Sequence, residues 1–291
     1  MENLVWSVDP ILLKVGPVSV HWYGVLFGMA FLVGFSLMRS VFRKEGKPER
    51  YLDPLWFYMG IGTVVGARLG HVLFYDPAYY LSHPLQIVAV WNGGLASHGG
   101  AIGIALALYL FSRRHPETPY VWLLDRMAIP AVLGGCFIRI GNFFNSEIAG
   151  LPSNLPWAVI FQRIDELPRH PTQLYEALCY FLIFWLLYAT YQRRYPALPQ
   201  GMLSGLFLVL VFVARFFLEF TKMPQASFEG SMPLSVGQLL SIPTIVVGLI
   251  LLWRCRKVSS LQAPPGPGVE AASASEKSSI SRSLRRSLPR P

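Results

Sequence analysis

Three arginines stand inside long apolar stretches of this sequence, namely Arg68, Arg139 and Arg215. A charged side chain in such a place is costly unless it is paired, hydrated or functional. The planar guanidinium group suits phosphate and carboxylate groups, which it can bind through two parallel hydrogen bonds. No set of His, Cys or acidic residues with the spacing of metal ligands accompanies these arginines. They therefore indicate a site for an anionic group such as a lipid headgroup.

The densest group of polar residues is the run from Arg139 to Gly150, which reads RIGNFFNSEIAG. Arg139 and Asn142 are three residues apart and share one helix face. Asn145 and Glu147 follow where the chain would leave the membrane. A polar helix terminus is the simpler interpretation of this run. We call Arg139, Asn142, Asn145 and Glu147 the polar ladder. Such a row of polar side chains is unfavourable against lipid tails and well suited to a polar headgroup, so we predict a binding site here.

Two further pairs of charged residues lie within apolar segments. Arg215 and Glu219 are four residues apart, so their side chains could pair on one helix face. This pair could be purely structural, or Glu219 could orient an arginine that binds a ligand, and the two roles are compatible. Asp125 and Arg126 are adjacent in the chain and point apart. We therefore expect each of them to find a partner elsewhere.

The elements that must position these residues are membrane-spanning helices. The chain has 291 residues, of which 53% are hydrophobic and 14% charged, whereas about 25% are charged in an average soluble domain. A spanning helix needs about 20 mostly apolar residues. The sequence therefore predicts an all-α polytopic membrane protein with about seven transmembrane helices, near residues 19–42, 55–75, 87–112, 121–141, 173–191, 202–221 and 236–253.

Two of these spans are weak, because glycines and His98 interrupt 87–112 and charged residues interrupt 121–141. Interrupted spans are tolerated where the backbone is buried in protein or lines a wet cavity. Glycines at every fourth position predict close helix packing in the span near 55–75, at Gly62, Gly66 and Gly70.

The basic residues predict how the chain crosses the membrane. The formal net charge is +9, but the charges lie in short clusters between the spans and in the C-terminal tail, not along one stripe, which argues against nucleic-acid binding. Cytoplasmic loops carry an excess of Lys and Arg. Seven spans place the N-terminus in the periplasm and the C-terminus in the cytoplasm, with eleven basic residues inside (Arg43, Lys44, Lys47, Arg50, Arg113, Arg114, Arg193, Arg194, Arg254, Arg256 and Lys257) and four outside (Lys14, Arg163, Arg169 and Lys222).

The sequence divides into a membrane domain and a tail. Residues 1–257 contain all the predicted spans. The longest connection, 142–172, falls on the outer side and is rich in Pro, Asn and Gly, so we expect a small folded periplasmic cap. Residues 258–291 are rich in Ser, Pro and Arg with few large apolar residues, which predicts a disordered basic tail in the cytoplasm.

Together these residues resemble those of bacterial prolipoprotein diacylglyceryl transferases. The resemblance covers about residues 10–255 and rests on the run Arg139–Gly150, which matches the family signature RxGNFxNxExxG. It also rests on seven other ordered blocks, namely His21–Gly24, Gly66–Gly70, Trp91–Gly94, Ser97–Gly100, Arg169–Glu176, Arg215–Phe220 and Gly237–Ser241. The family usually has Gly before the signature arginine, and this chain has Ile138. It often has F-R-x-P after the second arginine, where this chain has Lys222. A lysine keeps the positive charge of an arginine but cannot make the two parallel hydrogen bonds of a guanidinium group.

The resemblance implies a seven-span enzyme of the bacterial inner membrane that needs no metal and no cofactor. Its partners would be phosphatidylglycerol and the signal peptide of a prolipoprotein with its lipobox cysteine. The enzyme would move the sn-1,2-diacylglyceryl group to the cysteine thiol, forming a thioether and releasing glycerol phosphate. An anionic-lipid transporter or flippase is the alternative that would use the same arginines, although it predicts an internal repeat that the sequence lacks.

Each candidate residue has an expected role in this reaction. His98 is the leading candidate for the general base, because an imidazole ordinarily titrates near neutrality, and Tyr23 is the second candidate or a positioning group. Catalytic roles fall to His98, Arg139, Arg215 and Tyr23, binding of phosphatidylglycerol to Arg139, Asn142, Glu147, Gly150 and Arg215, and supporting roles to Arg68, His21 and Glu219.

Overall fold

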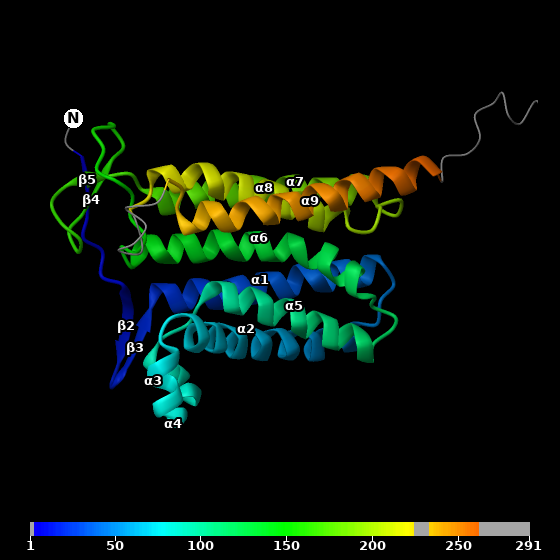
Figure 1. Cartoon of the computed structure of the whole chain (residues 1–291), viewed down its shortest axis with the longest axis horizontal. Helices are drawn as coiled ribbons and strands as arrows, with labels where there is room; N and C mark the ends of the chain where they lie inside the picture. Colours follow the sequence, from blue (N-terminus) through cyan, green and yellow to red (C-terminus); the bar gives the residue numbers. More distant parts are fainter. Residues whose placement is uncertain (1–2, 224–232, 262–291) are drawn as a thin grey trace, which may run out of the picture.

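The computed structural model describes residues 3–223 and 233–261. Within these residues the chain forms a bundle of seven long helices that run roughly along one axis (Figure 1). The expected all-α polytopic architecture is confirmed. The helices are α1 (Trp22–Lys44), α2 (Leu52–Phe74), α5 (Ser97–Arg114), α6 (Tyr120–Phe144), α7 (Thr172–Arg194), α8 (Met202–Leu218) and α9 (Val236–Leu261).

Six of these helices are long and apolar enough to span a membrane. The seventh, α5, has only 18 residues and packs along α2. The predicted start of its span at residue 87 is wrong, because the helix begins at Ser97. Gly93 and Gly94 have φ angles of +82° and +70°, which no continuous helix accommodates. The residues before them form a short helix α4 (Pro84–Val88) and a 3-10 turn η2 (Val90–Asn92).

Small residues let α2 and α5 approach closely, as the glycine spacing predicts. A Cβ atom added to Gly66 would lie 2.7 Å from the Cα of Gly103 on α5. The amide of Ala96, at the start of α5, donates to the carbonyl of Ala67 at 2.9 Å. Contact of this kind replaces lipid around both helices, and it offsets the lower apolarity of α5.

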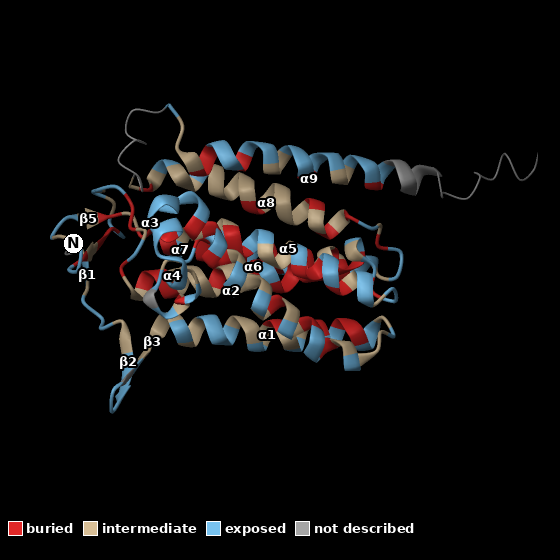
Figure 2. Cartoon of the chain, turned by 60° about the horizontal axis from the view of Figure 1, so that its bottom comes forward, coloured by how far each residue is buried: buried red, intermediate tan, exposed pale blue. Residues whose placement is uncertain are grey.

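Helix α6 is the centre of the bundle and packs against α1, α5, α7 and α8. More than half of its apolar stretch is buried, against a third or less in the other candidate spans (Figure 2). Asp125 of α6 accepts hydrogen bonds from the amides of Gly201 and Ser204 at 2.6 and 2.9 Å, at the start of α8. Arg126 pairs with Glu45 at 2.9 Å. Each charge therefore has a partner elsewhere, as expected, but the two side chains do not point apart, since Nη1 of Arg126 also lies 3.7 Å from Oδ2 of Asp125.

A small cap closes one end of the bundle, where the strands and the short helix α3 (Pro77–Ser82) also lie (Figure 1). Strands β1 (Leu4–Trp6), β4 (Val159–Phe161) and β5 (Pro168–Arg169) form a sheet in the order β1-β4-β5, with β1 parallel to β4 and β4 antiparallel to β5. A hairpin of β2 (Ile11–Val15) and β3 (Val18–His21) leads into α1.

The boundaries of the cap and the tail differ from the expectation. The N-terminal strand belongs to the cap, since Trp6 packs on Phe143 with ring centroids 4.3 Å apart. Helix α6 continues to Phe144, so the connection proper begins at residue 145. At the other terminus α9 runs to Leu261, past the predicted boundary at 258. The rest of the predicted tail, 262–291, lies outside the described residues.

The contact between α2 and α5 leads to a prediction about stability. Gly66→Ala should lower the melting temperature in detergent, because the new methyl group meets backbone atoms of α5 and overpacking costs about 1–3 kcal/mol. Gly60→Ala is the matched control in the same helix, since nothing lies within 4 Å of its added Cβ. The change can be followed by tryptophan fluorescence during heating. Equal melting temperatures for the two variants would contradict the close packing.

Candidate active site

Arg139 lies in the last two turns of α6, at the capped end of the bundle. Its Nε lies 2.9 Å from Oε2 of Glu176, which is in the second turn of α7. Its Nη1 donates to Oδ1 of Asn142 at 3.3 Å. The predicted sharing of one helix face by Arg139 and Asn142 is confirmed. Glu176 is fully buried, so the guanidinium is fixed by a neighbouring helix as well as by its own.

The polar ladder continues from Asn142 to Glu147. Asn142 donates from Nδ2 to Oε2 of Glu147 at 2.9 Å, and Asn145 donates to Oε1 of the same carboxylate at 3.3 Å. Glu147 follows Ser146, whose φ of +57° turns the chain sharply at the end of the helix. Such a conformation is uncommon for a non-glycine residue. The turn returns the carboxylate to the helix face that carries Asn142.

The first turn of α7 holds this loop in place. Gln173 donates from its side chain to the carbonyl of Glu147 at 2.6 Å, and Thr172 donates to the carbonyl of Ile148 at 2.7 Å. Both α7 side chains are fully buried. Buried hydrogen bonds of this kind are costly to leave unmade. The strained turn and its carboxylate are therefore positioned by α7.

Gly150 ends the ladder in a tightly packed position. Its amide donates to the carbonyl of His170 at 3.0 Å, and its own carbonyl accepts from Arg169 at 3.1 Å. A Cβ atom here would lie 2.5 Å from the Cβ of His170, so packing demands glycine. Arg169 also hydrogen bonds to Asp165 at 3.0 Å and holds the pKa of that carboxyl below its usual value. Gly150 therefore shapes the loop through its backbone.

A second group of charges adjoins the first through Glu176. Lys222 lies just beyond α8, where its Nζ contacts Oε1 of Glu176 at 3.0 Å and Oε2 of Glu219 at 2.9 Å. All three side chains are almost fully buried. Glu176 therefore forms ion pairs with two cations, Arg139 and Lys222. Lys222 pairs with two carboxylates of the protein itself, and a single positive charge is enough for this role without the forked group of an arginine.

Arg215 has a different environment from the one that its spacing suggests. Glu219 pairs with Lys222 and not with Arg215, which has no ion pair or hydrogen bond within residues 3–223 and 233–261. Its charge acts on the hydroxyl of Tyr180, which also interacts with Arg139. The structural-pair interpretation of Arg215 and Glu219 is therefore wrong. A half-buried guanidinium without a partner among the described residues is a candidate for binding an anionic ligand.

Tyr23 joins this cluster from the first turn of α1. Its ring packs against Gly141, where an added Cβ would lie 2.9 Å from the Tyr23 ring. The side chain is close enough to Glu147 and Arg139 to interact with both charges. His21, two residues before Tyr23, is exposed, and no contact in the described part of the chain joins its side chain to the cluster. The structure therefore brings Tyr23 but not His21 to the ladder.

Arg68 and His98 lie in a separate group on α2 and α5. Arg68 donates to the carbonyls of Ile87 and Gly93 at 2.9 and 2.5 Å, and also to those of Gly94 and Gln86. All of its donor nitrogens are engaged by the loop before α5, so it holds that loop and not an anion. The ring of His98 lies 5.4 Å from that of Phe74. No contact among the described residues joins His98 to Arg139 or Arg215.

Three functional candidates were missed by the sequence reasoning. Glu176 is an acidic residue inside the predicted span 173–191, so the rule that charges within spans need explanation could have found it. Lys222 stood out only as a departure from the family pattern. Tyr180 carried no signal, because a tyrosine in a span is ordinary. No group of three or more His, Cys, Asp or Glu side chains in the described part could hold a metal ion.

The fold and the site together define a polytopic membrane protein with a charged binding region at one end of its bundle. A family model described as prolipoprotein diacylglyceryl transferase matches residues 10–254. The chain therefore belongs to the prolipoprotein diacylglyceryl transferase family. The match includes every residue of the ladder and of the adjoining charge cluster.

Several relatives are similar over nearly their whole length, and each carries the name phosphatidylglycerol–prolipoprotein diacylglyceryl transferase. The protein from Tolumonas auensis is 55% identical over 249 residues, which cover 86% of this chain and 96% of the relative. The protein from Chloroherpeton thalassium is 50% identical, with 89% and 97% covered. The protein from Porphyromonas gingivalis is 42% identical, with 87% and 95% covered.

The shared carboxylate leads to a prediction about stability. Glu176→Gln should reduce the free energy of unfolding by about 3–5 kcal/mol, the cost of breaking a buried ion pair, because Arg139 and Lys222 would lose their common partner. Glu49→Gln removes an exposed carboxylate that also contacts two arginines, and it should cost much less. Denaturant titration in detergent measures both. Similar losses for the two variants would exclude the central role of Glu176.

Proposed function

We propose that this protein transfers the sn-1,2-diacylglyceryl group from phosphatidylglycerol to the cysteine thiol of a prolipoprotein. The observation that carries this proposal is the guanidinium of Arg215, which has no partner in residues 3–223 and 233–261, beside the fixed ladder of Arg139, Asn142 and Glu147. This arrangement offers a phosphate group a free cation and a second, rigidly held one. Membership of the transferase family supports the same reaction.

The proposed reaction is a displacement at one carbon of the lipid. The thiolate sulfur attacks the glyceryl carbon that bears the phosphate oxygen, a C–S bond forms, and the C–O bond breaks. The electron pair of that bond leaves with glycerol phosphate, and the thiol proton passes to a base on the enzyme. Negative charge moves onto the leaving phosphate oxygen. Preorganised cations in a site shielded from water stabilise such a transition state strongly.

The residues of the ladder have distinct roles in this proposal. Arg215 binds the phosphate directly, and Arg139 supplies a second cation whose position Glu176 and Asn142 fix. Asn142 and Glu147 position the glycerol headgroup, since their amide and carboxylate suit hydroxyl groups. Gly150 contributes by permitting the loop, because its backbone groups are already engaged. Glu219 acts through Lys222, and Arg68 acts through the loop before α5.

The proton acceptor is assigned to His98, with Tyr23 as the second candidate. Tyr23 lies beside Glu147 and Arg139 and therefore fits a positioning role at the headgroup. His98 lies on α5, beside Phe74. This assignment requires that the signal peptide present its lipobox cysteine between α5 and the ladder. The thiol would then meet the imidazole on one side and the lipid on the other.

We further propose that the protein resides in the bacterial inner membrane with the ladder at the periplasmic end. The opposite end carries the basic last turns of α1, α5 and α7, which suits the cytoplasmic side. The N-terminus is then periplasmic and the C-terminus cytoplasmic. A secreted prolipoprotein would present its cysteine at the same membrane face as the ladder.

The main test uses purified protein, phosphatidylglycerol labelled in its acyl chains and a peptide with a lipobox cysteine. The wild type should form a diacylglyceryl adduct that mass spectrometry detects. Arg139→Ala and Arg215→Ala should each lower the rate by at least about 10²–10³, the usual cost of losing one electrostatic contact in a transition state. Arg163→Ala changes an exposed arginine of the cap and should leave the rate unchanged. Lipid movement without any adduct would favour the flippase instead.

A second test examines the proton acceptor. His98→Gln should lower kcat by about 10²–10⁴, the usual contribution of a general base. Tyr23→Phe should raise KM more than it lowers kcat. A His98→Gln enzyme with near-normal kcat would remove His98 from the mechanism.

A further inference from the structure

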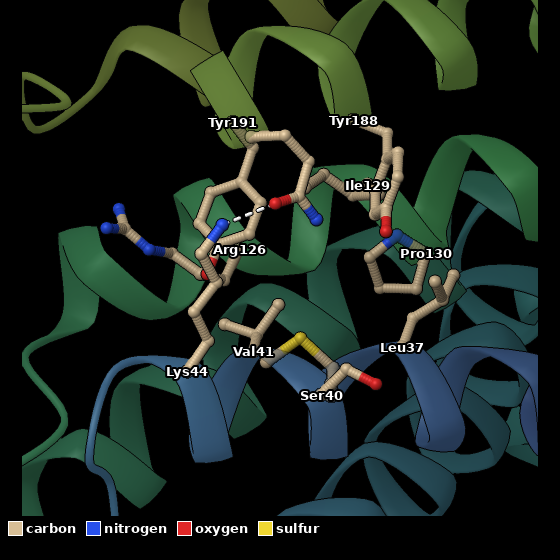
Figure 3. Close-up of a pocket in the computed structure, with 11 residues that line it drawn as sticks. Leu37, Ser40, Val41, Lys44, Arg126, Ile129, Pro130, Tyr188 and Tyr191 are labelled. Atoms are coloured by element: carbon tan, nitrogen blue, oxygen red, sulfur yellow. Dashed lines mark hydrogen bonds between the residues drawn. The ribbon is translucent and has the colours of Figure 1, made fainter. Parts of the chain in front are cut away.

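A cavity lined by both polar and apolar side chains lies at the end of the bundle opposite the ladder. It has a volume of about 70 Å³ and lies between α1, α6 and α7. Figure 3 shows Leu37 and Val41 of α1 facing Ile129 and Pro130 of α6 across it. A single water needs only about 10–15 Å³ and several polar partners. A space several times larger, with Leu37, Val41 and Pro130 in its lining, has room for part of a hydrocarbon chain.

The mouth of this cavity carries a lysine, Lys44, that has no carboxylate partner in the part of the chain that the structure describes. Lys44, in the last turn of α1, donates to the side-chain oxygen of Gln192 on α7, and its Nζ lies 4.9 Å from the centroid of the Tyr191 ring (Figure 3). No ion pair within the described residues involves Lys44, whereas its neighbour Glu45 is taken by Arg126. The side-chain amide of Gln192 and the ring of Tyr191 therefore hold the ammonium group of Lys44 at the mouth, and no carboxylate of the described residues neutralises its charge.

The position of the cavity along the bundle fits one leaflet of a membrane. Tyr23 and Lys44 stand 21 residues apart on α1, which corresponds to about 30 Å along a helix. The hydrocarbon core of a bilayer has the same thickness. Lys44 therefore lies at the membrane surface opposite the ladder. The last turn of α7 adds Arg193 and Arg194 at the same level.

We propose that this cavity is a binding site for an anionic phospholipid of the leaflet opposite the candidate active site. The phosphate binds Lys44 and the amide of Gln192, and the first part of one acyl chain enters between Leu37, Val41 and Pro130. The lipid neutralises the lysine and fills the space between α1, α6 and α7. The site is independent of the proposed transferase activity, because it lies at the other membrane surface.

The cavity itself favours an intact lipid over a free anion. The exposed polar side chains of Lys44 and Gln192 lie at its mouth, and aliphatic side chains of α1 and α6 form much of the wall beside the buried Arg126 and Tyr191. Inorganic phosphate would use the mouth and leave the apolar space empty. A neutral phospholipid would fill the space without compensating Lys44. Only an amphipathic anion satisfies both parts of the site.

The experiment counts lipids bound to the full-length protein by native mass spectrometry after delipidation in detergent. The probe is dioleoylphosphatidic acid, compared with dioleoylphosphatidylcholine and inorganic phosphate. Lys44→Gln removes the charge, and Ser40→Phe places an aromatic ring at the exposed rim of the cavity. Arg113→Gln is the matched control, since it removes a basic residue from the last turn of α5, outside the cavity.

Wild type and Arg113→Gln should bind phosphatidic acid equally at this site. Lys44→Gln should bind it about fivefold more weakly, the usual effect of one basic residue at a membrane surface, and Ser40→Phe should hold one lipid fewer. The proposal is overturned if Lys44→Gln binds like wild type, or if Arg113→Gln weakens binding equally. It is also overturned if phosphatidylcholine or phosphate binds as tightly. Since Lys44 is exposed, its variant decides the question even if Ser40→Phe misfolds.

Discussion

The buried carboxylate of Glu176 is the contact on which the capped end of the bundle depends. It receives Arg139 from α6 on one oxygen and Lys222, which follows α8, on the other. Removing such charges from water is costly, and the cost is recovered only when the partners have good geometry. The three elements that carry these groups must therefore meet in one arrangement. That arrangement fixes the direction of Arg139 and hence the face on which the ladder forms.

The strained turn at Ser146 depends on the same arrangement. Its left-handed backbone is uncommon outside glycine, and such strain persists only where the surrounding structure imposes it. The side chains of Thr172 and Gln173 impose it here through the carbonyls of the loop. They lie one turn before Glu176 on α7. One helix terminus therefore positions the cation, the turn and, through the turn, the carboxylate of Glu147.

The sequence predicted what local spacing determines and missed what tertiary contact determines. Arg139 and Asn142 share a face because helix geometry requires it, and the glycines of α2 predicted the contact with α5. The partner of Glu219 could not be predicted, because Arg215 at four residues and Lys222 at three were both possible by spacing. The start of α5 was missed because the loop before it is held by Arg68, whose carbonyl partners lie 18 to 26 residues further along the chain.

The two ends of the bundle show why a buried charge alone does not identify a site. At the end opposite the cap, Asp125 is satisfied by the amides at the start of α8 and Arg126 by Glu45, so these charges hold helices together. At the capped end, Arg139 and Lys222 are satisfied in the same way by Glu176. Arg215 differs because the described chain offers it no such partner. Because this half-buried charge has no partner among the described residues, we propose that it binds the anionic headgroup.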